Sequence, residues 1–150
     1  MPLRYYDDIA VGERIEYGEV TMTRDEMLTF AEKYDPQPIH TDPEAAAETM
    51  YGGIIASGWQ TAAVVMRLLV EGALSDMASV GARGVDELRW RRPVYPGDTL
   101  SLETEILDKR PSETHDNRGY VNHGVRGVNG DGETVISWIG LGIIQRRTGN

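Results

Sequence analysis

The stretch Ser57-Gly58-Trp59-Gln60-Thr61-Ala62-Ala63-Val64-Val65-Met66-Arg67-Leu68-Leu69-Val70-Glu71-Gly72-Ala73 decides the fold of this chain. Ser57 and Gly58 suit a helix start, and the residues after them predict a long helix with a broad apolar face. We expect that face to contain Trp59, Ala62, Ala63, Met66, Leu69, Val70 and Ala73. Because few charges interrupt the segment, the helix should be largely buried.

The chain after this helix has the pattern of β-strands separated by turns. Four strands are expected, at residues 86–93, 99–107, 119–128 and 134–146. The clearest is 99–107, where alternation places Leu100, Leu102, Thr104 and Ile106 on the inner face. Tyr95-Pro96-Gly97-Asp98 suits a type II turn, and Asn129-Gly130-Asp131-Gly132 suits a hairpin turn.

The chain before the long helix predicts one strand and two helices. The strand spans residues 14–22, and a capping box formed by Thr23 and Glu26 starts the first helix. That helix must end at Asp35, because the ring of Pro36 disfavours helical geometry in the residue before it. Asp42 and Pro43 then predict the start of a short second helix.

This order of elements predicts an α+β fold. The connections between the last strands are mostly too short for parallel crossovers, so the sheet should be antiparallel. The apolar helix finds burial on the concave face of a curved sheet. We therefore expect a hot-dog fold, with about five antiparallel strands wrapped around a long central helix, as a single domain over residues 1–150. Pairing two sheets edge to edge would cover one open edge per subunit, which predicts a homodimer or a higher homo-oligomer.

Composition limits the classes of partner. The 150 residues carry a formal net charge of −9, so the long-range field repels nucleic acid and anionic lipid. The absence of cysteine rules out disulfides and thiolate catalysis. The opening residues lack an apolar signal region, and the most apolar stretch is too short to span a bilayer. We expect a cytoplasmic protein that binds neither nucleic acid nor membrane.

The segment Asp35-Pro36-Gln37-Pro38-Ile39-His40 carries the chemistry. It places a carboxylate and an imidazole a few residues apart, and Gly58 opens the apolar helix nearby. Adding or removing water beside a carbonyl group needs one group that handles the water proton and another that stabilises charge on oxygen. We expect Asp35 to be the base, with its pKa raised by the helix C-terminus and an apolar cleft. No cofactor or metal is required.

The same segment resembles the MaoC-like family of acyl-CoA dehydratases and (R)-specific enoyl-CoA hydratases. The family signature, Gly-Asp-x-Asn-Pro-aliphatic-His, is matched by Tyr34-Asp35-Pro36-Gln37-Pro38-Ile39-His40, with Tyr34 and Gln37 as the departures. Segments 53–58, 84–90 and 92–98 look similar to the family as well. The resemblance implies that Asp35 and His40 are catalytic, and that the Gly58 amide meets the oxygen of a thioester. It also implies an acyl-CoA or acyl-carrier-protein thioester as substrate, hydrated or dehydrated between the 2-enoyl and 3-hydroxyacyl forms.

Five further residues are expected to contact the substrate. These are Gln37, Ser57, Trp59 and Met66 near the acyl group, and Arg89, which with Arg91 and Arg92 could bind coenzyme A phosphates. Alternating arginines are also typical of a solvated strand face. Two other functions stay open. One is a thioesterase with an acidic residue on the central helix, and the other is a non-catalytic acyl-CoA-binding subunit.

Overall fold

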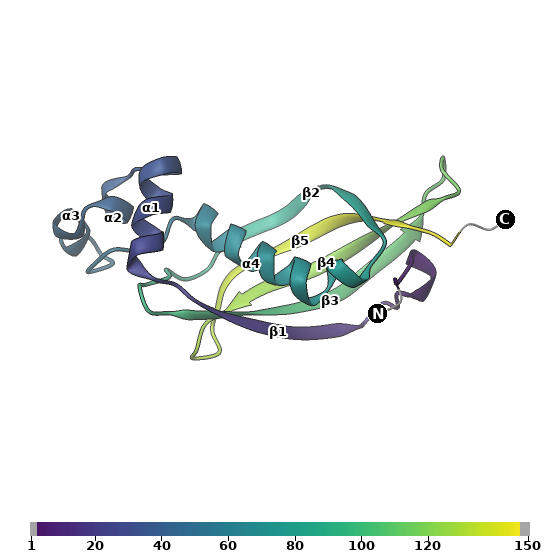
Figure 1. The fold of residues 1–150 in the computed structure, drawn as a ribbon, viewed down its shortest axis with the longest axis horizontal. Helices are drawn as coiled ribbons and strands as arrows, with labels where there is room; N and C mark the ends of the chain where they lie inside the picture. The colour runs from purple at the N-terminus through teal and green to yellow at the C-terminus, as the bar shows by residue number, and fades with distance from the viewer. Residues whose placement is uncertain (1–2, 148–150) are drawn as a thin grey trace.

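The computed structural model describes residues 3–147, which form a curved five-stranded sheet with a helix lying across one face (Figure 1). The strands are β1 (Arg14–Thr21), β2 (Ser79–Trp90), β3 (Thr99–Pro111), β4 (Arg118–Val128) and β5 (Thr134–Gln145). Their order in the sheet is β1-β3-β4-β5-β2, and every neighbouring pair is antiparallel. The α+β hot-dog prediction is therefore confirmed.

The helices are α1 (Arg24–Tyr34), α2 (Pro38–Thr41), α3 (Pro43–Ala47) and α4 (Gly58–Gly72), with short 3-10 turns at Tyr6–Asp8 and Leu74–Asp76. The first three helices gather at one end of the sheet, where α4 begins (Figure 1). The sequence did not predict α2. Pro38 occupies its first turn, where a missing N–H leaves no helical hydrogen bond unmade. Among residues 3–147, no helix is long and apolar enough to cross a bilayer.

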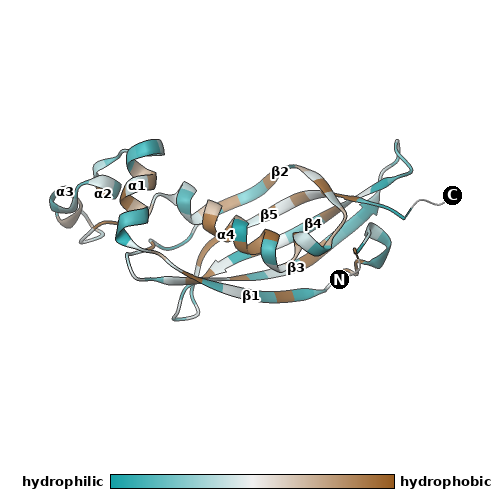
Figure 2. Cartoon of the chain, in the orientation of Figure 1, coloured by the Kyte–Doolittle hydropathy of each residue, from teal (hydrophilic) through white to brown (hydrophobic). Residues whose placement is uncertain are grey.

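The main core lies between α4 and the inner face of the sheet. Leu100, Leu102, Thr104 and Ile106 are all buried, as the alternation in β3 predicted. Val65, Leu68 and Leu69 of α4 are buried too. Figure 2 shows apolar residues along α4 and along the strands that it covers. Burying these side chains supplies the main favourable term in folding.

The predicted buried face of α4 is partly wrong. Trp59, Met66 and Val70 are 57%, 41% and 41% exposed, whereas the buried set is Gln60, Thr61, Val65, Leu68 and Leu69. The helix is apolar on more than one side, so periodicity alone could not choose the side that faces the sheet. One chain therefore leaves an apolar stripe of α4 uncovered.

Strand β2 begins at Ser79, earlier than the predicted Asp86. Gly81 and Gly84, which suggested a turn, lie within the strand with φ of +145° and +147°, beside register shifts against β5. Glycine tolerates these backbone angles, and an edge strand tolerates such bulges. The result is a longer edge strand than the sequence suggested.

Candidate active site

Asp35 and His40 face each other because two prolines bend the chain between them. Helix α1 ends before Asp35, and Pro38 opens α2, which returns His40 toward the carboxylate. His40 Nε2 lies 3.4 Å from Asp35 Oδ2. The His40 side chain is only 7% exposed and the Asp35 side chain 17%. The sequence prediction that this segment pairs a carboxylate with an imidazole agrees with this geometry.

The His40 ring is held by a backbone carbonyl. Its Nδ1 lies 2.8 Å from the carbonyl oxygen of Ile55, which can only accept a hydrogen bond. Nδ1 therefore carries a proton and donates a hydrogen bond to the Ile55 carbonyl. This contact fixes the ring orientation and leaves Nε2 as the nitrogen that faces Asp35.

Asp35 accepts hydrogen bonds at both carboxylate oxygens. Gln37 Nε2 donates to Oδ1 at 2.7 Å, and Ser57 Oγ donates to Oδ2 at 2.7 Å. The Gln37 bond is the largest influence on the pKa of Asp35, which lies below its ordinary value; Ser57 and His40 lower the pKa further, while burial opposes them. The predicted upward shift is therefore wrong, because two local donors outweigh burial.

Ser57 connects this carboxylate to the start of α4. It is fully buried, and its Oγ accepts a hydrogen bond from the Trp59 amide at 3.3 Å, which caps the helix. The Gly58 amide, one residue into the helix, has no acceptor among residues 3–147. A free N–H at the positive end of a 15-residue helix is a ready donor to a negatively charged oxygen.

Gly58 also packs against Trp90, a residue that the sequence did not single out. A Cβ at Gly58 would lie 2.4 Å from Trp90 Nε1. Trp90 in turn meets Trp59 edge to face, with ring centroids 5.0 Å apart. Glycine is needed here to admit the indole ring. Trp90 and Gly58 are far apart in sequence, and nothing in the strand pattern signals the contact.

These residues border one cleft of about 460 Å³. Five of the predicted site residues line it, namely Asp35, Gln37, His40, Gly58 and Trp59. Ser57 lies behind Asp35 and contacts it directly. Met66 and Arg89 do not line the cleft. Tyr51 and Arg91 line it, and the sequence had offered Arg91 with Arg89 and Arg92 as a contact for coenzyme A phosphates. Thr61 and Trp90 also line the cleft, and nothing in the sequence indicated either.

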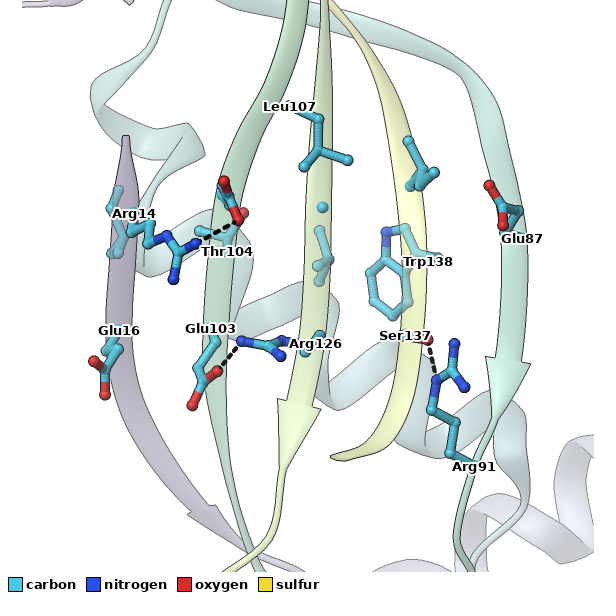
Figure 3. Close-up of a pocket in the computed structure, with 15 residues that line it drawn as sticks. Arg14, Glu16, Glu87, Arg91, Glu103, Thr104, Leu107, Arg126, Ser137 and Trp138 are labelled. Carbon is cyan, nitrogen blue, oxygen red and sulfur yellow. Dashed lines mark hydrogen bonds and ion pairs between the residues drawn. The ribbon is translucent and has the colours of Figure 1, made fainter. Parts of the chain in front are cut away.

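A second hollow of similar size lies on the other face of the sheet (Figure 3). Along β3 and β4, the charged residues that line this hollow alternate with buried residues of the core. Two of its arginines form ion pairs with carboxylates. Arg14 lies 3.3 Å from Glu105, and Arg126 pairs with Glu103. The hollow contains no histidine. The carboxylate–imidazole pair predicted from the sequence therefore belongs to the first cleft.

Comparison with known proteins identifies the family. Residues 8–126 match the family described as MaoC like domain. The chain belongs to the MaoC-like family. A MaoC-like dehydratase from Rhodospirillum rubrum is 38% identical, with 95% of this chain and 97% of that chain covered and a TM-score of 0.88.

Two other relatives of this MaoC-like chain carry activities in their names. The 3-hydroxyacyl-thioester dehydratase Z of Mycobacterium tuberculosis is 43% identical over 101 residues, which cover 65% of this chain and 67% of that protein. The (R)-hydratase PhaJ1 of Pseudomonas aeruginosa is 28% identical, with a TM-score of 0.74 and coverage of 95% and 86%.

Proposed function

We propose that this protein is a hydro-lyase that interconverts 2-enoyl and 3-hydroxyacyl thioesters. One observation carries the proposal: Asp35 Oδ2 and His40 Nε2 lie 3.4 Å apart in the wall of a cleft that also contains the free amide of Gly58. Water addition next to a thioester needs these three parts. The relatives named hydratase and dehydratase support the same reaction class.

The two side chains divide the proton transfers. A water molecule within reach of both atoms attacks the β-carbon of the enoyl thioester and gives a proton to Asp35 Oδ2. His40, protonated on Nε2, donates a proton to the α-carbon. The proton on Oδ2 then passes to Nε2 and restores the starting state, and dehydration follows the reverse route. The bonds from Gln37 and Ser57 keep Asp35 ionised and fixed, although they lower its basicity.

The thioester oxygen gains negative charge as the water adds. The Gly58 N–H points from the first turn of α4, where the helix dipole favours that charge. A single preorganised donor of this kind contributes about a hundred- to a thousandfold in rate. Trp59 and Trp90, which line the same cleft, offer an apolar surface for the acyl group.

The proposal includes a homodimer. Trp59, Met66 and Val70 on α4 are exposed, as are Val80, Val85 and Trp90 on the edge strand β2. The Trp59–Trp90 contact makes the two sets continuous. An open strand edge beside exposed apolar side chains is suited to a second copy that pairs through β2.

The test is to incubate the protein with trans-2-enoyl-CoA substrates of increasing chain length. Loss of the conjugated double bond, without release of free thiol, is the expected result. Thiol release without hydration would instead indicate a thioesterase. The position of acidic groups disfavours that alternative: α4 carries none between Gly58 and Val70, and Glu71 at its far end is paired with Arg67 at 3.1 Å.

A non-catalytic acyl-CoA-binding subunit is the third possibility. Such a protein would bind an enoyl-CoA without loss of the conjugated double bond and without release of free thiol. Both members of the Asp35–His40 pair are present and in contact, which favours catalysis over binding alone.

A further inference from the structure

The three arginines near the end of β2 differ in how their charge is neutralised. Arg92 Nη1 lies 3.2 Å from Glu133 Oε2. Arg89 Nη1 donates to the Leu88 carbonyl, and Arg89 lines neither hollow. Arg91 Nε donates to the hydroxyl of Ser137 at 2.7 Å, and no carboxylate of residues 3–147 lies within 4.0 Å of its guanidinium nitrogens. Of the three, Arg91 combines a place in the cleft lining with an uncompensated charge.

Arg91 stands at the border between the two hollows. It lines the cleft that holds Asp35 and also the hollow on the outer face of the sheet, where Figure 3 shows its side chain reaching Ser137. Its backbone is fixed as well, because the Arg91 amide donates to the Val135 carbonyl at 2.8 Å. A long ligand whose reacting end lies at Asp35 and His40 would pass Arg91 if it left the cleft beside Trp90.

Resting on the proposed function, we propose that Arg91 binds a phosphate group on the carrier arm of the thioester substrate. Ser137 occupies Nε and orients the guanidinium plane, so that Nη1 and Nη2 stay available for phosphate oxygens. A protein with a net charge of −9 repels anions at long range, and a local uncompensated arginine supplies the attraction that the whole molecule lacks.

The phosphate has two possible sources on such a substrate. One is the 4′-phosphate of the phosphopantetheine arm, which coenzyme A and acyl carrier proteins share. The other is the adenosine phosphate portion that only coenzyme A carries. The same enoyl group attached to coenzyme A, to 4′-phosphopantetheine and to pantetheine separates them, because pantetheine carries no phosphate.

The test compares hydration kinetics of Arg91→Gln with the wild type on these three substrates. We expect KM for the coenzyme A substrate to rise about ten- to a hundredfold, the range for losing a charge-assisted hydrogen bond, with kcat unchanged. KM for the pantetheine substrate should not change. A rise with 4′-phosphopantetheine as well assigns the contact to the shared 4′-phosphate, and a rise with coenzyme A alone assigns it to the adenosine phosphates. Arg91→Lys should retain part of the affinity, because it keeps the charge.

Arg126→Gln is the matched control, since Arg126 lines the outer hollow but is paired with Glu103. It should leave all three KM values unchanged. Equal KM changes on all three substrates, or no change on any, would overturn the assignment of Arg91. Calorimetric titration with coenzyme A alone should show the same loss of affinity in Arg91→Gln. That titration tests the phosphate site even if the wild type hydrates none of the substrates, a result that would instead refute the proposed reaction.

Discussion

Asp35 illustrates how immediate neighbours set the properties of a proposed catalytic group. Its place after helix α1 suggested a raised pKa, yet Gln37 and Ser57 each donate a hydrogen bond at 2.7 Å and stabilise the ionised form. The sequence showed which residue types lie near Asp35, but the direction of a side chain such as Gln37 depends on how Pro36 and Pro38 turn the backbone. The sequence could therefore indicate Asp35 as a site residue, but it could not predict the direction in which the pKa of Asp35 is shifted.

Asp35→Asn and His40→Ala should each lower kcat for enoyl-CoA hydration at least about a hundredfold, because each removes one of the two groups that we propose to move protons. The measurement is steady-state turnover, together with size-exclusion chromatography to verify that the assembly persists. Glu32→Gln, which removes an exposed carboxylate from α1, is the control and should retain full activity. A variant of Asp35 or His40 with a near-normal rate would exclude that residue from the mechanism.

Gln37→Ala should move the acidic limb of the pH profile of kcat/KM to higher pH. The Gln37 bond is the largest influence that lowers the pKa of Asp35, so its loss raises that pKa, and the carboxylate becomes protonated at a higher pH than in the wild type. Thr41→Val, which removes the side-chain contact of Thr41 with the Gln37 carbonyl but leaves the Asp35 bond, serves as a comparison. An unmoved acidic limb in Gln37→Ala would show that Asp35 does not control it.

At the scale of elements, the sequence predicted those whose ends are chemically marked. Asp35 before Pro36 ends α1, Asp42 caps α3, and Ser57 caps α4, all as expected. Two features had no such marker. Helix α2 is a single turn without a side-chain cap, and the buried side of α4 depends on packing against the sheet, which periodicity cannot reveal in a helix that is apolar on more than one side.

The contact between α4 and β2 gives a prediction at this scale. Gly58→Ala should destabilise the fold by about 1–3 kcal/mol, because the added methyl overlaps the Trp90 ring. In a Trp90→Ala background the same substitution should have little effect, since the indole is gone. Urea unfolding of the four proteins measures the coupling between the two sites. Equal destabilisation in both backgrounds would mean that the two residues do not interact.

At the scale of the whole molecule, one chain leaves apolar surface open on α4 and β2. Met66→Glu and Val85→Glu should each weaken self-association, because each places a charge in the surface that the second copy would cover. Light scattering over a range of protein concentrations measures the change. Val11→Glu is the control, since Val11 is 56% exposed and lies in the turn before β1, outside both elements. Unchanged dimerisation in Met66→Glu and Val85→Glu would locate the interface elsewhere.

The stability of the whole molecule should also depend on His123. This side chain of β4 is 3% exposed, neither ring nitrogen has a hydrogen-bond partner among residues 3–147, and burial lowers its pKa. Below about pH 6.5, the ordinary value for histidine, the unfolded chain therefore binds a proton that the folded chain does not, and the free energy of unfolding must fall as the pH falls. The lowered pKa of Asp35 acts in the same direction, but only near and below its ordinary value of 3.8, so the two contributions separate.

His123→Leu should flatten the decline in the free energy of unfolding below about pH 6.5, because the group that resists protonation in the fold is gone. Urea unfolding at several pH values and one fixed protein concentration gives the slopes, and the fixed concentration keeps any contribution from subunit association constant. His115→Ala, at an exposed histidine between β3 and β4, should keep the wild-type slope. If His123→Leu also kept that slope, protonation of the buried imidazole could not be the source of the acid sensitivity, and other titrating groups would have to account for it.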